Sequence, residues 1–268
     1  SPPTPSYPLS RSLPLASPRT PFPPSRAVGA PTRSPLRIFA PRFPLLALLL
    51  YPPPVRTRIK ICGVRDLPGA LAAAEAGADA VGFVFVPASI RNITPADALE
   101  IALVLPPMIT KVALLVDPAP DDAARLAAEF PLDAIQLHGS EDERAVADVR
   151  EAVGCPVYKA VRYDPDSIGD ELRRWEAVPE VDAILVDGSA GGQGTAFDWA
   201  GLARAAAGVE APIVLAGGLT PDNVADAIAA AHPFAVDVSS GVEKPRGVKD
   251  PALIARFARA VHRADAAD

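Results

Sequence analysis

The stretch PIVLAGGLTPDNVADAIAAA, residues 212–231, contains one complete structural unit. Its first part is a short run of branched apolar residues, which predicts a buried strand, and Gly217-Gly218 predicts a turn. Thr220 followed by Pro221 predicts the N-cap and first residue of a helix, and alanine and isoleucine then recur at helical spacing. A strand, a turn and a helix in this order are typical of a parallel sheet.

The same pattern recurs from Arg58 to the C-terminus. The other strand candidates are residues 58–62, 80–85, 110–116, 134–138, 157–161, 183–187 and 234–240. Helices are expected to begin at Thr94, followed by Pro95, and after Asp66, Pro120, Ser140, Ser167, Asp198 and Asp250. Eight strands would then alternate with eight helices.

The strands are almost continuously apolar, which favours a parallel sheet covered on both faces. Eight units in residues 57–268 suit a single (β/α)₈ barrel, the TIM barrel, near the lower end of its size range. A doubly wound open sheet is the alternative. It usually carries a glycine-rich first turn, whereas CGVRDLPG after the first strand is not a GxGxxG motif.

The first 56 residues differ from the rest of the chain. They contain 16 of its 32 prolines, seven arginines and no acidic residue. So many prolines interrupt any helix or strand, and we expect residues 1–56 to be a disordered leader. A misplaced start, a targeting segment and a proline-rich arm that binds a partner stay open as alternatives.

Composition restricts the function of residues 57–268. The whole chain has a formal charge of −6, and since residues 1–56 contribute +7, the remainder carries −13. The apolar run LLALLLY is far shorter than the roughly 20 residues of a membrane span. Two cysteines make no disulfide framework and lack a zinc-ligand spacing. We expect a cytoplasmic protein with no metal, no membrane partner and no nucleic-acid partner.

In a barrel of this type, catalytic groups lie at the C-terminal ends of the strands. The residues at those positions are Cys62, Phe85, Asp117, His138, Val161, Asp187, Gly217, Gly218, Asp237, Ser239, Ser240 and Gly241. Several of them are polar although an apolar residue would serve the fold equally well.

Two of these strand ends suit a phosphate group. LAGG and DVSSG combine small residues, whose backbone amides are accessible, with serine hydroxyls. Each motif taken alone is equally well explained as a tight turn that needs glycine. Because the two follow the seventh and eighth strands, together they favour phosphate binding.

Cys62 and Asp187 each permit two interpretations. Asp187 precedes the flexible stretch GSAGGQG, and a loop of this kind would be able to close over a substrate bound at Asp187. The alternative is that Asp187 only forms a cap or a salt bridge at the rim of the barrel. Cys62 is an inert core thiol, or a base if nearby positive charge lowers its pKa. Lys60, two residues earlier on the strand, points to the same side and would supply that charge.

The motifs KICG, GADAVGFVF, QLHG, GGQGTAFDW, LAGGLTPDNV and FAVDVSSGVE, in unbroken order, resemble the phosphoribosylanthranilate isomerase family. The resemblance implies a TIM barrel that catalyses an Amadori rearrangement, an aldose–ketose isomerisation in tryptophan biosynthesis, without a cofactor. The substrate is a small phosphosugar. General base and general acid fall on Cys62 and Asp187.

The resemblance also implies residues that bind the substrate. The arginine that holds the substrate's carboxylate falls on Arg91, and the other binding residues are Gln136, His138, Gly217, Gly218, Asp237, Ser239, Ser240 and Gly241. Two departures from the family pattern are Asn92, where a tyrosine usually follows the arginine, and Thr195, where many relatives have lysine. The protein is expected to be a monomer or a homodimer.

Two other functions stay open. The histidine-pathway isomerases resemble this chain in fold but carry aspartates at the ends of strands 1 and 5, where Cys62 and Val161 stand here. A non-catalytic protein that acts through its proline-rich arm is the second, and it would lose function on deletion of residues 1–56.

Overall fold

The computed structural model describes residues 56–188 and 197–267. The predicted leader, apart from Arg56, therefore lies outside the described residues, as do Thr195 and most of the glycine-rich stretch after Asp187. The division of the chain into residues 1–56 and 57–268 stays a prediction.

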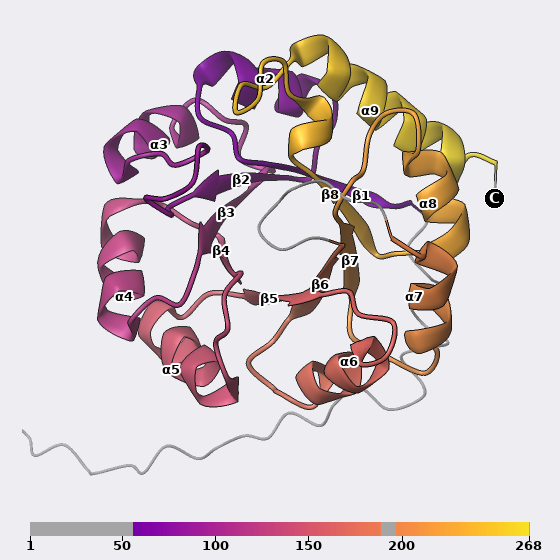
Figure 1. The fold of residues 1–268 in the computed structure, drawn as a ribbon. Coiled ribbons are helices and arrows are strands. Elements are labelled where there is room, and N and C mark those ends of the chain that lie inside the picture. Colours follow the sequence, from indigo (N-terminus) through magenta and orange to yellow (C-terminus); the bar gives the residue numbers. More distant parts are fainter. Residues whose placement is uncertain (1–55, 189–196, 268) are drawn as a thin grey trace, which may run out of the picture. The chain divides into compact units, whose positions relative to one another are not determined.

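Eight parallel strands close into a barrel in which each strand pairs with its sequence neighbours and β8 pairs with β1. Figure 1 shows the closed ring of strands with the helices arranged around it. The strands are β1 (Arg58–Cys62), β2 (Ala80–Val84), β3 (Thr110–Leu115), β4 (Ala134–Leu137), β5 (Val157–Arg162), β6 (Ala183–Asp187), β7 (Ile213–Ala216) and β8 (Ala235–Val238). The expected TIM barrel is confirmed, and closure excludes the open doubly wound sheet.

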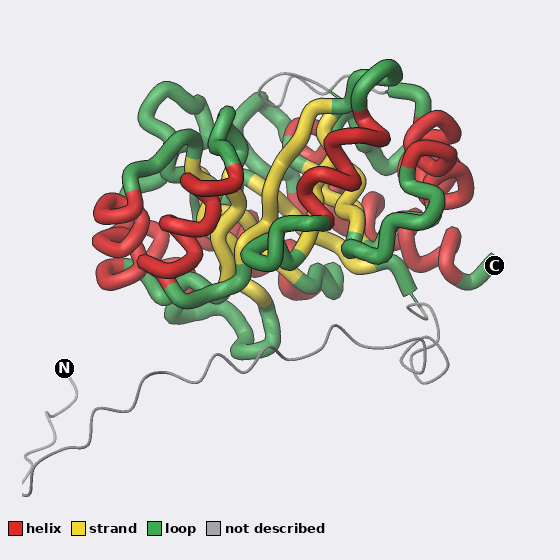
Figure 2. Tube along the Cα trace, turned by 90° about the horizontal axis from the view of Figure 1, so that it is seen from below, coloured by secondary structure: helices red, strands yellow, loops and turns green. Residues whose placement is uncertain are grey.

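Eight α-helices follow the strands within the described residues, one after each strand, as expected. They are α2 (Leu67–Glu75), α3 (Pro95–Ala102), α4 (Pro120–Glu129), α5 (Glu143–Val153), α6 (Ile168–Glu176), α7 (Trp199–Ala205), α8 (Val224–Ala231) and α9 (Pro251–Asp265), with the 3₁₀ turn η1 (Ser240–Val242) before α9. The side view in Figure 2 shows strands inside and helices outside. None of the helices among the described residues has the length and apolar character to span a bilayer.

Most of the expected helix starts are confirmed. The side chains of Asp66, Thr94, Asp198 and Asp250 each accept a backbone N–H in the first turn of the following helix, an interaction typically worth about 1 kcal/mol.

The start expected at Thr220 is wrong, because α8 begins three residues later, at Val224, with Asn223 as its N-cap residue. The Asn223 side chain accepts the Thr220 N–H at 2.7 Å and donates to the Gly218 carbonyl at 2.9 Å. These bonds hold residues 220–223 as a turn, so the helix starts only after it.

Two packed layers stabilise the barrel. Large side chains that include Phe83, Trp175 and Phe257 are almost fully buried in the larger core cluster, which includes residues of the barrel strands and the surrounding helices. The second cluster consists of small and medium residues, namely Ala160, Ala183, Leu185, Val214, Ala216 and Ala235. Because these residues are small, they leave room for a cavity near the N-terminal ends of the strands.

At those N-terminal ends, aspartates tie neighbouring strands together. Asp79, just before β2, accepts the Ile59 N–H of β1 at 2.8 Å. Asp133 accepts the Lys111 N–H of β3 at 2.8 Å, and Asp182 accepts the Val157 N–H of β5 at 2.9 Å. Each carboxylate satisfies a backbone donor at a strand start, so this end of the barrel is built for stability.

Candidate active site

The C-terminal ends of the strands surround a cavity of about 140 Å³, which we name the C-terminal cavity. Its lining residues are Cys62, Val84, Val86, Ser89, Arg91, Leu114, Val116, Gln136, His138, Asp187, Asp237 and Ser239. Seven of the residues expected from the sequence therefore meet in one place. The apolar wall formed by Val84, Val86, Leu114 and Val116 was not anticipated, because strand residues of this kind are indistinguishable from core residues in the sequence.

Cys62 is the last residue of β1 and is 5% exposed. It lies beside Gly82 of β2, where a Cβ atom would stand only 2.9 Å from the thiol sulfur. The following Gly63 has φ +76°, a conformation that favours glycine, and a Cβ there would lie 2.5 Å from the Arg91 Cδ. Glycine therefore follows the cysteine because the chain turns there and Arg91 packs closely against it.

The thiol is surrounded by opposite charges. Lys60 points to the same side as Cys62, as expected, and its Nζ donates to Asp237 at 2.8 Å. Burial raises the pKa of the Cys62 thiol above its ordinary value and Asp237 raises it further, while Lys60 and Lys249 act in the opposite direction. Lys60 therefore acts to lower the thiol pKa, but burial outweighs its effect, so the pKa does not fall below its ordinary value as the interpretation of Cys62 as a base expects.

Asp187 ends β6 and is 6% exposed. The His138 Nε2 lies 3.6 Å from its Oδ2, and the Gln136 Nε2 lies 2.8 Å from the His138 Nδ1. Burial lowers the pKa of the imidazole, so His138 is neutral near pH 7. With the Gln136 amide donating to Nδ1, the ring carries its proton on Nε2, which faces Asp187.

A smaller cavity of about 40 Å³ adjoins Asp187 at the ends of β7 and β8. Gly217, Gly218, Ser239 and Ser240 line it, so the two motifs expected to bind phosphate meet. Gly217 has φ +87° and packs tightly against the backbone of Gly188. Gly241 is not among the lining residues; it packs against the Leu219 carbonyl, where the two turns touch.

Arg91 lies in the loop between β2 and α3 and is 7% exposed. Its Nε and Nη2 donate to the two carboxylate oxygens of Glu243 at 2.7 and 3.0 Å, and its Nη1 takes no part in this pair. Asn92, at the position where the resemblance implies a tyrosine, forms a parallel β-bridge with Val84. The loop is thus held by backbone pairing with β2. Glu243, which pairs with Arg91, is not among the site residues expected from the sequence.

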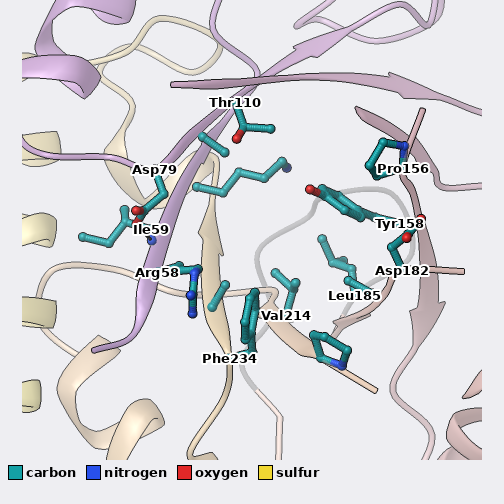
Figure 3. A pocket seen from close by; sticks show the side chains of 15 residues that line it. Arg58, Ile59, Asp79, Thr110, Pro156, Tyr158, Asp182, Leu185, Val214 and Phe234 are labelled. Atoms are coloured by element: carbon teal, nitrogen blue, oxygen red, sulfur yellow. Dashed lines mark hydrogen bonds between the residues drawn. The ribbon is translucent and has the colours of Figure 1, made fainter. Parts of the chain in front are cut away.

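A larger cavity, of about 280 Å³, lies at the opposite end of the barrel and is named the N-terminal cavity. Its lining includes Arg58, Ile59, Tyr158, Val214 and Phe234. Figure 3 shows Asp79 and Asp182 on opposite sides of it, and both carboxylates already accept strand N–H groups. The residues expected from the sequence to act in catalysis or substrate binding do not line this cavity.

Similarity to known proteins agrees with this geometry. The family model described as N-(5′-phosphoribosyl)anthranilate isomerase matches residues 59–260. The enzyme of that name from Pseudomonas fluorescens strain Pf0-1 is 44% identical over 209 residues, covering 76% of this chain and 98% of the relative.

Two solved structures show the same fold. The dimeric phosphoribosylanthranilate isomerase of Thermotoga maritima, solved as monomers, is 37% identical, with a TM-score of 0.68 and coverage of 77% of this chain and 99% of that one. A phosphoribosylanthranilate isomerase in complex with reduced 1-(o-carboxyphenylamino)-1-deoxyribulose 5-phosphate is 38% identical, with a TM-score of 0.68 and the same coverage.

Proposed function

The chain belongs to the N-(5′-phosphoribosyl)anthranilate isomerase family, and we propose that Cys62 and Asp187 are its catalytic base and acid. Its activity is the Amadori rearrangement of N-(5′-phosphoribosyl)anthranilate to 1-(2-carboxyphenylamino)-1-deoxyribulose 5-phosphate, an isomerisation in tryptophan biosynthesis. The observation that carries the proposed roles is that both side chains line the one C-terminal cavity, each at the end of its strand.

The reaction requires one proton donor and one proton acceptor. Asp187 gives a proton to the furanose oxygen, the C1–O bond breaks, and the ring opens to a Schiff base whose nitrogen is cationic. The Cys62 thiolate then removes the C2 proton, and the electrons of the C2–H bond neutralise the nitrogen to give an enolamine, which tautomerises to the ketone. The cationic nitrogen acidifies C2, so a thiolate is a sufficient base.

The other lining residues bind and orient the substrate in this proposal. Arg91 binds the anthranilate carboxylate through a charge-assisted hydrogen bond, and Glu243 fixes its guanidinium plane. The turns after β7 and β8 bind the phosphate through Gly217, Gly218, Ser239 and Ser240. Gly241 supports those turns by packing against the Leu219 carbonyl.

The remaining polar side chains act on the two catalytic groups. His138, held by Gln136, directs its Nε2 proton at Asp187 and so orients that carboxyl group. Asp237 holds Lys60 beside the thiol.

The test is turnover by the full chain. N-(5′-phosphoribosyl)anthranilate is unstable, so it is generated in the reaction mixture, and product is followed by chromatography and mass spectrometry. We expect product with wild type, and with Cys62→Ala a rate about two to four orders of magnitude lower. Turnover by Cys62→Ala at the wild-type rate would exclude the proposed base.

We further propose that the protein acts in the cytoplasm as a monomer or a homodimer and that residues 57–268 form the catalytic domain. The Thermotoga maritima relative is described as dimeric, which supports the homodimer. The family model begins at residue 59, which supports residues 57–268 as the catalytic domain. Light scattering after gel filtration measures the mass. Limited proteolysis with assay of the fragment shows whether activity stays with residues 57–268.

A further inference from the structure

A buried ionic cluster lies beside the proposed base. It consists of Arg91, Glu243 and Lys249, and we name it the Arg91–Glu243–Lys249 cluster. The Lys249 Nζ donates to the Glu243 Oε1 at 2.8 Å, and the same carboxylate accepts both bonds from Arg91. The side chains of Glu243 and Lys249 are each only 1% exposed. A buried charge is costly unless it is paired, so each member depends on the others.

The cluster is joined to Cys62 through one serine. The Lys249 Nζ donates to the carbonyl and the hydroxyl of Ser239, at 3.0 and 3.3 Å. The Ser239 hydroxyl in turn donates to the Cys62 carbonyl at 3.0 Å. Lys249 therefore connects the backbone of the proposed base with the turn that is proposed to bind phosphate.

The charges facing the thiol do not cancel. Lys60 of β1 and Asp237 of β8 form a neutral pair. The Arg91–Glu243–Lys249 cluster holds two cations and one carboxylate, so it leaves one positive charge in excess. On the β2 side the neighbour is Gly82, which has no side chain. The C-terminal cavity adds His138, which is neutral, and Asp187, which carries its proton in the proposed role of acid.

We propose that Lys249 is a positioning residue that fixes Ser239 and Cys62 and supplies the excess positive charge that stabilises the Cys62 thiolate. Without Lys249 the cluster would be neutral, and the buried thiol would face no compensating cation beyond the Lys60–Asp237 pair. The inference rests on the proposed role of Cys62 as the base, but its test does not require turnover. Consistent with the geometry, Lys249 counters part of the burial that raises the pKa of Cys62.

The test measures the reactivity of the thiol directly. The full chain is alkylated with iodoacetamide, a small reagent, at a series of pH values, and modification is quantified by peptide mass spectrometry. Cys155, which is half-buried and lies outside the C-terminal cavity, reports on the same sample as an internal control.

Lys249→Met and Glu243→Gln should move Cys62 in opposite directions. Loss of the lysine removes a positive charge, and we expect the midpoint of Cys62 alkylation to rise by about one pH unit. Loss of the Glu243 charge leaves both cations unneutralised, and we expect the midpoint to fall by a similar amount. The Cys155 midpoint should be unchanged in both variants, and Lys249→Arg should restore most of the wild-type value.

Lys111→Met is the matched control, because it removes another lysine that is paired with a carboxylate, Asp133, outside the C-terminal cavity. Lys111→Met should leave the midpoint of Cys62 alkylation at its wild-type value. General loosening of the fold would move Cys62 and Cys155 in the same direction in every variant and would overturn the proposal. So would an unchanged Cys62 midpoint in folded Lys249→Met.

Thermal melting monitored by circular dichroism establishes that each variant is folded. If Lys249→Met does not fold, the proposal is tested by Glu243→Gln alone. A Cys62 alkylation midpoint that does not fall in Glu243→Gln would then overturn the proposal. If the Cys62 alkylation midpoint shifts as expected in both variants but wild type shows no isomerase activity, the role of Lys249 stands and the proposed function is excluded. Failure of the Lys249 proposal and failure of the proposed function are therefore distinguishable.

Discussion

The two ends of the barrel each hold a cavity, and the larger one is not the candidate active site. The N-terminal cavity, about 280 Å³, is lined largely by apolar side chains and by aspartates that bond to strand N–H groups. The C-terminal cavity is half that size, about 140 Å³, and it is lined by a thiol, two carboxyl groups, an imidazole and a guanidinium. Convergence of chemical groups identifies a site better than volume does.

The difference follows from the direction of the chain. At the N-terminal ends Asp79, Asp133 and Asp182 satisfy backbone donors with which strands begin, so these carboxylates are already used by the fold. At the C-terminal ends the chain leaves the barrel in loops, and polar groups there pair with one another around a cavity. Substitutions at the C-terminal end should therefore lower mainly activity, and substitutions at the N-terminal end should lower mainly stability.

The largest effect is expected from Cys62→Ala at the C-terminal end. Removal of the proposed base should lower kcat by about two to four orders of magnitude, the usual contribution of a general base. KM should change little, because phosphate and carboxylate binding are intact. In wild type the rate should rise with pH above neutrality, since burial raises the thiol pKa and only the thiolate acts. A pH profile of kcat/KM for both proteins measures this, and a flat alkaline limb in wild type would argue against a thiolate base.

Asp187→Asn should also lower kcat by about two to four orders of magnitude, because the amide keeps the shape of the side chain but lacks a transferable proton. The double variant with Cys62→Ala should be much less than additively worse, since both groups serve one proton relay. Steady-state kinetics of the two single variants and the double variant measure this. Fully multiplicative losses would indicate that the two residues act in separate steps.

Glu243→Gln should show an effect on stability that depends on pH. Burial opposes ionisation of Glu243, but hydrogen bonds from Arg91 and Lys249 prevail and lower its pKa from 4.5 to about 2. The carboxylate therefore contributes about 3 kcal/mol of stability, fully present above pH 4.5 and lost as pH falls toward about 2.

Urea unfolding of wild type and Glu243→Gln between pH 3 and 7 measures this contribution. The difference in free energy of unfolding should be largest near neutrality and should shrink as the solution becomes more acidic. A difference that is constant across this range would show that the charge of Glu243 is not what stabilises the cluster.

Phe234→Ala at the N-terminal end should have the smallest effect and the opposite character. Phe234 is half-buried against the second core cluster, and the Arg58 guanidinium lies 4.1 Å from its ring centroid. Truncation should cost about 2 kcal/mol of stability while kcat stays within about twofold. Phe234→Leu, which keeps most of the volume, should cost less. Loss of activity with an unchanged melting temperature would show that the N-terminal cavity takes part in function.

The fold was predictable because its signals are local. Strand runs, turn residues and caps such as Asp66 and Thr94 lie within a few positions of the elements that they define. Thr220 misleads because the Thr-Pro pattern is that of a helix start, while the side chain of Asn223 closes a turn first. Such competition depends on three-dimensional geometry that a pattern does not contain.

The site was predictable where it follows from topology or from the resemblance to a known family. Cys62, Asp187 and Asp237 lie at or near strand ends, which meet at one end of any parallel barrel. The Arg91–Glu243–Lys249 cluster was not predictable, because Arg91 and Glu243 are 152 residues apart and neither Glu243 nor Lys249 belongs to a strand. The sequence left the state of the Cys62 thiol open for the same reason, since burial and Asp237 outweigh the effects of Lys60 and Lys249 on its pKa only in the folded chain.

The most direct test of the contrast between the two ends is a paired measurement on Cys62→Ala and Phe234→Ala, with kcat and melting temperature determined for each in one buffer. Cys62→Ala is expected to melt near the wild-type temperature and to lose kcat by orders of magnitude. Phe234→Ala is expected to melt several degrees lower and to retain kcat. Full activity in Cys62→Ala, or loss of kcat in Phe234→Ala at an unchanged melting temperature, would contradict the assignment of chemistry to the C-terminal end.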